Sequence, residues 1–147
     1  MFTPLDANWR ERCLASFAEQ AMMRTLGVDV GSVEPGEVAL VFDHDNRLTQ
    51  QHGFVHAGAL GTVLDSACGY AALSLMPADH AVLTVEYKLN LLRPAEGDRF
   101  EGRGRVVKQG RTLTVAEGVL TATNAPDRPI ATMTATLMAV ADRGIEN

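Results

Sequence analysis

One carboxylate in this sequence, Asp65, stands in a setting that suggests chemistry. It is the only acidic residue between Leu48 and Pro77, and no lysine or arginine lies between Arg47 and Lys88. An ionised carboxylate buried in a helix costs roughly several kcal/mol unless it is paired, hydrogen-bonded or open to a cavity. Because its own segment offers no cation, we expect Asp65 to face a ligand cavity, where a carboxylate can act as a base or a nucleophile.

The residues around Asp65 predict a helix with two unlike sides. It should begin near His56 to Gly58 and end at Met76, since Pro77 cannot continue a helix. Residues three, four and seven apart share a face, and the face of Asp65 carries small residues: Gly58, Gly61, Thr62, Cys68, Gly69 and Ala72. The opposite face is a broad apolar stripe suited to packing on a sheet: Leu60, Val63, Leu64, Ala67, Ala71 and Leu75.

The small face of this helix implies a need for space. Each glycine weakens a helix by about 0.5–1 kcal/mol relative to alanine, so a neighbouring helix, a thin substrate arm or both should require the room. At the start of the helix, the N–H groups of Ala57 and Gly58 lack helical partners and form a site for negative charge.

Length and composition indicate one ordinary domain, 1–147, in which 46% of the residues are hydrophobic. With no apolar run of about 18 residues and no signal pattern at the amino terminus, we expect a cytoplasmic protein with no membrane partner. A pI near 5.3 and 5% aromatic residues argue against a nucleic-acid partner. Cys13 and Cys68 are too few for a disulfide framework, and both lie on predicted helices, where buried free thiols are common.

The remaining segments predict an α+β fold. A helix capped by Thr3 should run to about Leu26 and end at Gly27, and two short runs at 28–33 and 37–42 predict a hairpin. We therefore expect a helix lying across a curved antiparallel sheet of about six strands, with a helical extension at 1–27 and a core at 28–140. Turn residues separate four longer predicted strands, of which the last three should form an antiparallel meander: 81–92, 98–109, 111–123 and 129–140.

A family resemblance is carried by the segment 50–65, which reads Q-Q-H-G-F-V-H-A-G-A-L-G-T-V-L-D. It resembles the signature of the PaaI-type thioesterases of the hotdog-fold superfamily, whose pattern runs Asn or Gln, Gly, His-Gly-Gly and then Asp on the central helix. The resemblance continues at 83–95, which is similar to the family's strand after the helix, and at 104–112. It covers roughly 28–140, so the amino-terminal helix lies outside the shared core.

The resemblance implies a hotdog fold and hydrolysis of the thioester of an acyl-CoA or aryl-CoA, at a site built on a dimer interface. Asp65 matches the catalytic carboxylate, acting as general base or as nucleophile. Gln50 matches the residue that binds the thioester carbonyl or positions water, and Thr84 matches a hydroxyl that helps to hold the water. The resemblance implies no cofactor and no metal, and a homodimer or a homotetramer that is a dimer of dimers.

Ala57 is the main departure from the family pattern, because it stands where the first glycine of His-Gly-Gly is expected. In the family the backbone N–H at this position donates to the oxyanion. Alanine keeps that N–H if its φ and ψ are helical, and adds a methyl group beside the thioester. A thioester is already activated, so a base and an oxyanion donor suffice, and losing one such donor costs about 10²–10³ in rate.

Coenzyme A carries phosphates, so we expect a cationic surface. The segment 88–111 has seven Lys or Arg against three acids, a net charge of +4, whereas the rest of the chain has six against fifteen, or −9. Arg93, Lys108 and Arg111 are the candidates for phosphate contacts, with solubilising charges on exposed strands as the alternative. Further candidates for lining the substrate site are His56, Gly58 and Gly69.

Other interpretations stay open. One is a hotdog hydratase or dehydratase acting on acyl thioesters, although the histidine-proline-glycine motif of the acyl-carrier dehydratases is absent. Another is a non-catalytic acyl-CoA-binding or scaffold protein, in which Asp65 is a buried acid hydrogen-bonded across a dimer interface. His52 and His56 have the spacing of a helical metal pair, but Gly53 between them favours a loop, and no third ligand is evident.

Overall fold

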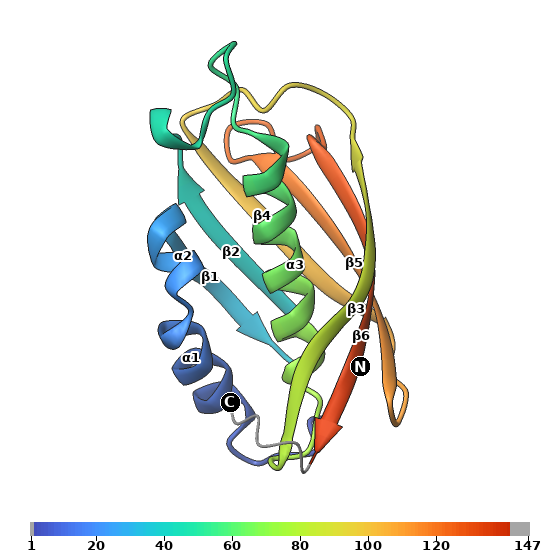
Figure 1. Ribbon diagram of the computed structural model, residues 1–147. Coiled ribbons are helices and arrows are strands. Elements are labelled where there is room, and N and C mark those ends of the chain that lie inside the picture. Colours follow the sequence, from blue (N-terminus) through green and yellow to red (C-terminus); the bar gives the residue numbers. More distant parts are fainter. Residues whose placement is uncertain (1, 142–147) are drawn as a thin grey trace.

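One long helix lies across a six-stranded sheet, and two short helices run beside it (Figure 1). The computed structural model describes residues 2–141. The helices are α1 (Trp9–Glu19), α2 (Ala21–Leu26) and α3 (Ala57–Leu73), with one 3-10 turn at Asn46–Leu48. The strands are β1 (Val28–Glu34), β2 (Glu37–Asp43), β3 (His80–Leu91), β4 (Arg99–Lys108), β5 (Leu113–Ala122) and β6 (Ala131–Ala141).

The strands form one antiparallel sheet in the order β1-β2-β4-β5-β6-β3. The predicted hairpin is β1 with β2, joined at Gly36, whose φ of 79° lies in the left-handed region. The predicted meander of β4, β5 and β6 is confirmed. β3 follows α3 in sequence but pairs with β6, so it forms one edge of the sheet.

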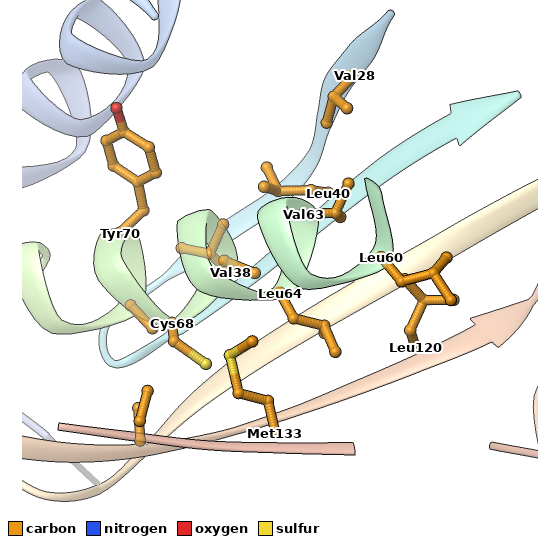
Figure 2. Close-up of a cluster of buried hydrophobic side chains, with 14 of the residues drawn as sticks. Val28, Val38, Leu40, Leu60, Val63, Leu64, Cys68, Tyr70, Leu120 and Met133 are labelled. Carbon is orange, nitrogen blue, oxygen red and sulfur yellow. The ribbon is translucent and has the colours of Figure 1, made fainter. Parts of the chain in front are cut away.

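The apolar stripe of α3 packs on the sheet as predicted. Leu60, Val63, Leu64 and Ala67 are each at most 3% exposed, and Figure 2 shows Leu64 pointing toward the strands. Burying such side chains removes apolar area from water at about 25 cal/mol per Å², which is the main force holding the helix on the sheet. With 17 residues α3 is the longest helix, and no helix of residues 2–141 is long and apolar enough to cross a membrane.

α3 lies so close to β4 that a side chain at Gly104 would not fit between them. A methyl group at Gly104 would lie 2.4 Å from backbone atoms of Ala67 and Cys68. Cys68, assigned from the sequence to the face of Asp65, is instead fully buried, and a methyl group at Gly118 would lie 3.2 Å from its sulfur. The glycines of the strands therefore fix how near the helix can come.

The amino-terminal segment differs from its prediction, because it is two helices instead of one. Residues 2–8 are not helical, and Asp6 accepts a hydrogen bond from the backbone N–H of Asn8 at 2.8 Å, so Thr3 does not cap a helix. At Gln20 the backbone is extended, with ψ of 103°, and this residue separates α1 from α2. α2 then ends at Gly27, with φ of 65°, as predicted.

Arg12 fastens α1 to the end of α3. Its guanidinium donates to the carbonyls of Leu73 at 3.0 Å, Met76 at 2.9 Å and Pro77 at 2.5 Å. Its Nε lies 3.3 Å from the Asp6 carboxylate, and only 10% of its side chain is exposed. The last carbonyls of a helix lack helical partners and attract positive charge, so Arg12 pairs with that of Leu73 and with two carbonyls just beyond the helix.

Candidate active site

Two of the residues predicted for the site, Asp65 and Thr84, meet in the structure. Thr84 Oγ1 donates a hydrogen bond to Asp65 Oδ1 at 2.7 Å. Among residues 2–141, no lysine, arginine or histidine forms a salt bridge with this carboxylate. The carboxylate opens to a cavity of about 300 Å³, called here the Asp65 cavity, which Gly69 and Val82 also line.

An irregularity in β3 directly follows Thr84, which faces the helix. In the pairing with β6, Thr84 lies opposite Leu137 and Glu86 opposite Thr136, so Val85 is an extra residue. A bulge of this kind shifts the alternation of faces and commonly occurs beside active sites. Consequently Tyr87 also points toward α3, and its hydroxyl would lie 3.8 Å from a methyl group built at Gly61.

The start of α3 presents a backbone donor. His56 is the N-cap, and its Nδ1 accepts a hydrogen bond from the N–H of Gly58 at 2.9 Å. Ala57 is the first helical residue, and its N–H makes no hydrogen bond within the described part of the chain. The expected contact of His56 with the substrate stays a prediction, because the structure shows it as a cap.

Gln50 lies away from Asp65 in this single chain. Its side-chain oxygen accepts a short hydrogen bond from the backbone N–H of His52, and its backbone carbonyl accepts one from Gly53 at 3.0 Å. Gly53 has φ of 87°, which closes the turn. Gln50 does not line the Asp65 cavity, so its assigned role in the reaction stays a prediction.

Ala57 and Asp65 are also too far apart to act together within one chain. They are eight residues apart on one helix, and at 1.5 Å per residue this spacing is about 12 Å. A reacting carbonyl must lie about 3 Å from its oxyanion donor and near its base or nucleophile. In one copy of α3, Ala57 therefore offers a donor without a nearby carboxylate, and Asp65 offers a carboxylate without this donor.

A polar cluster that the sequence did not indicate lines the Asp65 cavity. We call it the Gln20 cluster, and it consists of Ser16, Gln20, Ser66 and Tyr70. Gln20 Nε2 donates to the Tyr70 hydroxyl at 3.0 Å, and Ser66 Oγ donates to Gln20 Oε1 at 3.3 Å. The Tyr70 hydroxyl also lies 3.3 Å from Ser16 Oγ. The only sequence signal was the spacing of Ser16 and Gln20, which places them on one helical face.

Neither cysteine has the surroundings of a nucleophile. Burial, with the negative charges of Asp65 and Glu117, raises the pKa of the Cys68 thiol to about 12. Burial raises the pKa of the Cys13 thiol to about 11. Since the thiolate is the reactive form, both thiols are inert near neutral pH. Within residues 2–141, no group of three or more His, Cys, Asp or Glu could hold a metal ion.

The basic segment 88–111 does not form one continuous surface. Arg99, Arg103 and Arg105 are ion-paired across strands, for example Arg103 with Glu37 at 2.6 Å. Arg93 lies near the start of α3, where the Val55 N–H bonds to the Ala95 carbonyl.

The other two candidates for phosphate contacts lie at the opposite end. Lys108 and Arg111 flank Gln109, which donates to the Leu75 carbonyl beyond the end of α3 at 3.0 Å. The assigned phosphate contacts of Arg93, Lys108 and Arg111 stay predictions, and none of these residues lines the Asp65 cavity.

Comparisons with known proteins place this geometry in a family. A family model described as the thioesterase superfamily matches residues 52–125. A candidate esterase from Halobacterium salinarum is 33% identical over 121 residues, which cover 78% of this chain and 80% of that protein. The chain belongs to the thioesterase superfamily. Membership supports hydrolysis of thioesters in general.

Solved structures confirm the predicted hotdog fold of this member of the thioesterase superfamily. A thioesterase family protein from Silicibacter pomeroyi is 56% identical, with a TM-score of 0.87 over 90% of this chain and 98% of that one. The Escherichia coli PaaI protein from the phenylacetic acid degradation operon superposes with a TM-score of 0.83, covering 93% of this chain and 96% of its own. Its identity is 20%, so this second likeness is one of fold alone.

Proposed function

We propose that the protein hydrolyses the thioester of an acyl-CoA or aryl-CoA, with Asp65 as the catalytic carboxylate. The observation that carries the proposal is that Asp65 has no cationic partner within residues 2–141, holds a hydrogen bond from Thr84 and opens to a cavity. An accessible carboxylate without a cationic partner can accept a proton or attack a carbonyl.

The reaction requires little beyond this carboxylate and an oxyanion donor. As a base, Asp65 takes a proton from water while the water oxygen bonds to the thioester carbon. The carbonyl oxygen becomes an oxyanion, to which the N–H of Ala57 donates. When the oxyanion collapses, the C–S bond breaks and Asp65 gives its proton to the leaving sulfur, so coenzyme A leaves as a thiol. As a nucleophile, Asp65 instead attacks the thioester carbon, which forms a mixed anhydride and expels coenzyme A as a thiolate that takes a proton from solvent. Water then cleaves the anhydride, which releases the free acid and restores the Asp65 carboxylate. Gln50 and Thr84 hold the carbonyl or the water.

Two copies of the chain complete the site. A two-fold axis can set two α3 helices antiparallel and side by side. Ala57 then lies beside the partner's Asp65 if the axis passes close to Gly61, which is midway between residues 57 and 65. Gly61 adds no side chain there, and Tyr87 and Leu89 of β3 are its nearest neighbours from outside α3.

The exposed edge of β3 is a second feature that fits a two-fold axis near Gly61. β3 is 12 residues long, and Val85, Tyr87 and Leu91 are 55%, 49% and 53% exposed. A long, apolar edge strand is a template for pairing with another strand. Pairing of β3 with its copy near Lys88 would extend the sheet and set the two α3 helices side by side. We propose at least a homodimer, and a dimer of dimers as the larger assembly.

The test is thiol release from a panel of acyl-CoAs and aryl-CoAs. We expect turnover by the unchanged protein and a loss of at least about 10² in Asp65→Asn, about 2.7 kcal/mol in barrier height. Asp65→Asn should melt as the unchanged protein does. Turnover of Asp65→Asn at the normal rate would remove this carboxylate from the mechanism. Addition of water to the acyl group without release of free thiol would favour a hydratase. Binding of the thioesters without turnover would favour a non-catalytic protein.

A further inference from the structure

The Asp65 cavity has a second polar region besides the reactive carboxylate. The Gln20 cluster lines the same cavity as Asp65 and Thr84, and two of its members, Ser16 and Gln20, come from the amino-terminal segment. This segment precedes the stretch that matches the thioesterase superfamily, which starts at residue 52. The cavity is therefore built in part by a segment that the family match does not include.

Gln20 keeps hydrogen-bonding capacity for a ligand. A glutamine amide has two N–H donors and two acceptor lone pairs. Within residues 2–141, one N–H is used by the Tyr70 hydroxyl and one lone pair by Ser66. One donor and one acceptor are left on the side chain that lines the cavity.

Tyr70 holds Gln20 in a fixed orientation. Its side chain points away from the sheet toward the amino-terminal helices (Figure 2), and it is only 5% exposed. Burial raises the pKa of the Tyr70 phenol, opposed by the hydrogen bonds with Ser16 and Gln20, so the phenol stays neutral. Phe17 packs on the ring edge, with centroids 5.7 Å apart. An amide held by a buried neutral hydroxyl is preorganised for a ligand.

We propose that the Asp65 cavity holds the acyl group of the substrate and that Gln20 hydrogen-bonds a neutral oxygen at its far end. The inference rests on the proposed thioesterase function and names its substrate class. That class is short cyclic or branched acyl groups that carry an ether, hydroxyl or carbonyl oxygen opposite the thioester. Gln20 would then determine the preference for acyl groups that carry this oxygen.

The size of the cavity supports a compact acyl group. An apolar cavity of about 150 Å³ holds a benzene molecule, so about 300 Å³ holds one ring with a short arm. At Gly69 a methyl group would meet only Leu137, at 3.8 Å, so this part of the helix leaves room for the ring. A long straight chain would extend out of this space.

The break between α1 and α2 also fits a binding role. Gln20 leaves helical geometry there, with ψ of 103°, and its side chain reaches Ser66 and Tyr70. Arg12 also tethers α1, because its guanidinium binds the carbonyls of Leu73 at the end of α3 and of Met76 and Pro77 beyond it. Attachment of the amino-terminal segment therefore does not depend on the Gln20 cluster alone.

The test compares two acyl groups of equal shape, tetrahydropyran-4-carbonyl and cyclohexanecarbonyl, which differ in one ring oxygen. Thiol release from each CoA thioester gives kcat/KM, and calorimetry gives Kd for the matching S-methylene thioethers, which cannot be hydrolysed. The variants are Gln20→Met, which keeps the length of the side chain, and the control Gln51→Met on the exposed loop. Melting temperatures report folding.

We expect the unchanged protein and Gln51→Met to favour the ring oxygen by about tenfold in kcat/KM and in Kd, and Gln20→Met to lose this preference. If no thioester is hydrolysed but the thioethers keep the preference, the proposed function fails and the cavity assignment stands. An equal preference in Gln20→Met and the unchanged protein overturns the inference. If Gln20→Met does not fold, the unchanged protein decides alone, and binding of both rings with equal affinity overturns it.

Discussion

The two sides of α3 use small residues for opposite purposes. On the side that faces the sheet, the glycines belong to the strands, and a methyl group at Gly104 would lie 2.4 Å from the helix backbone. On the side of Asp65, the glycines belong to the helix, and a methyl group at Gly69 or Gly61 would meet side chains no nearer than 3.5 Å. The first side fixes the position of the helix, and the second leaves a cavity beside the carboxylate.

A side chain added between α3 and β4 should cause a large loss of stability. In Gly104→Ala the new methyl group would overlap backbone atoms of Ala67 and Cys68, which cannot rotate away. We expect the free energy of unfolding to fall by at least about 3 kcal/mol, measured in urea. A variant as stable as the unchanged protein would mean that α3 does not approach β4 so closely.

The next effect concerns how the amino-terminal segment is held on α3. Arg12→Met removes the guanidinium that binds the carbonyls of Leu73, Met76 and Pro77, so we expect a loss of about 2 kcal/mol in the same assay. The matched control is Arg10→Met, because the Arg10 side chain is 56% exposed and its salt bridge with Glu34 is 3.8 Å long. The control should lose less than about 0.5 kcal/mol. Equal losses in the two variants would show that the Arg12 contacts add nothing.

The smallest effect should have the opposite sign, on the side of Asp65. In Gly69→Ala the methyl group fits without a clash, so replacing a helical glycine should raise the free energy of unfolding by about 0.5–1 kcal/mol. The same methyl group takes space from the Asp65 cavity, so turnover of the bulkiest acyl groups should fall while small ones are unaffected. If Gly69→Ala is less stable than the unchanged protein, Gly69 is needed for close packing, as Gly104 is.

The sequence was sufficient for the long elements of the fold. Hydrophobic alternation and turn residues predicted all six strands to within two residues at each end, because each strand is half-buried and bounded by turns. The break at Gln20 was missed, and the side chain of Gln20 there contacts Tyr70 and Ser66 on another helix, which local sequence patterns do not reveal. The bulge at Val85 was missed because it depends on the pairing of β3 with β6.

The sequence located part of the candidate site, whose residue roles stay predictions. Asp65 was evident because a lone acid on a small-residue face is unusual, and its contact with Thr84 agrees with the resemblance. The Gln20 cluster was missed because Ser16 and Gln20 are common on exposed helices. The net charge of the segment 88–111 overstates its free positive charge, because Arg99, Arg103 and Arg105 pair with acids on neighbouring strands. Only the strand register reveals those pairs.

In the proposed mechanism, Asp65 of one copy acts with the start of α3 in the other copy. Ala57→Pro tests the donor, because proline lacks the N–H and suits the first helical position, and His56 before it is already extended, with ψ of 140°. We expect Ala57→Pro to fold normally and to lose about 10²–10³ in turnover.

The most direct measurement is the activity of a mixture of Ala57→Pro and Asp65→Asn after their subunits exchange. Each variant alone should be nearly inactive. In a mixed dimer, one of the two sites joins an intact Asp65 to an intact Ala57, so equal amounts should recover about a quarter of normal turnover. Exchange is verified by mass spectrometry. A mixture that has exchanged its subunits and stays as inactive as its parents would contradict a site shared between two copies.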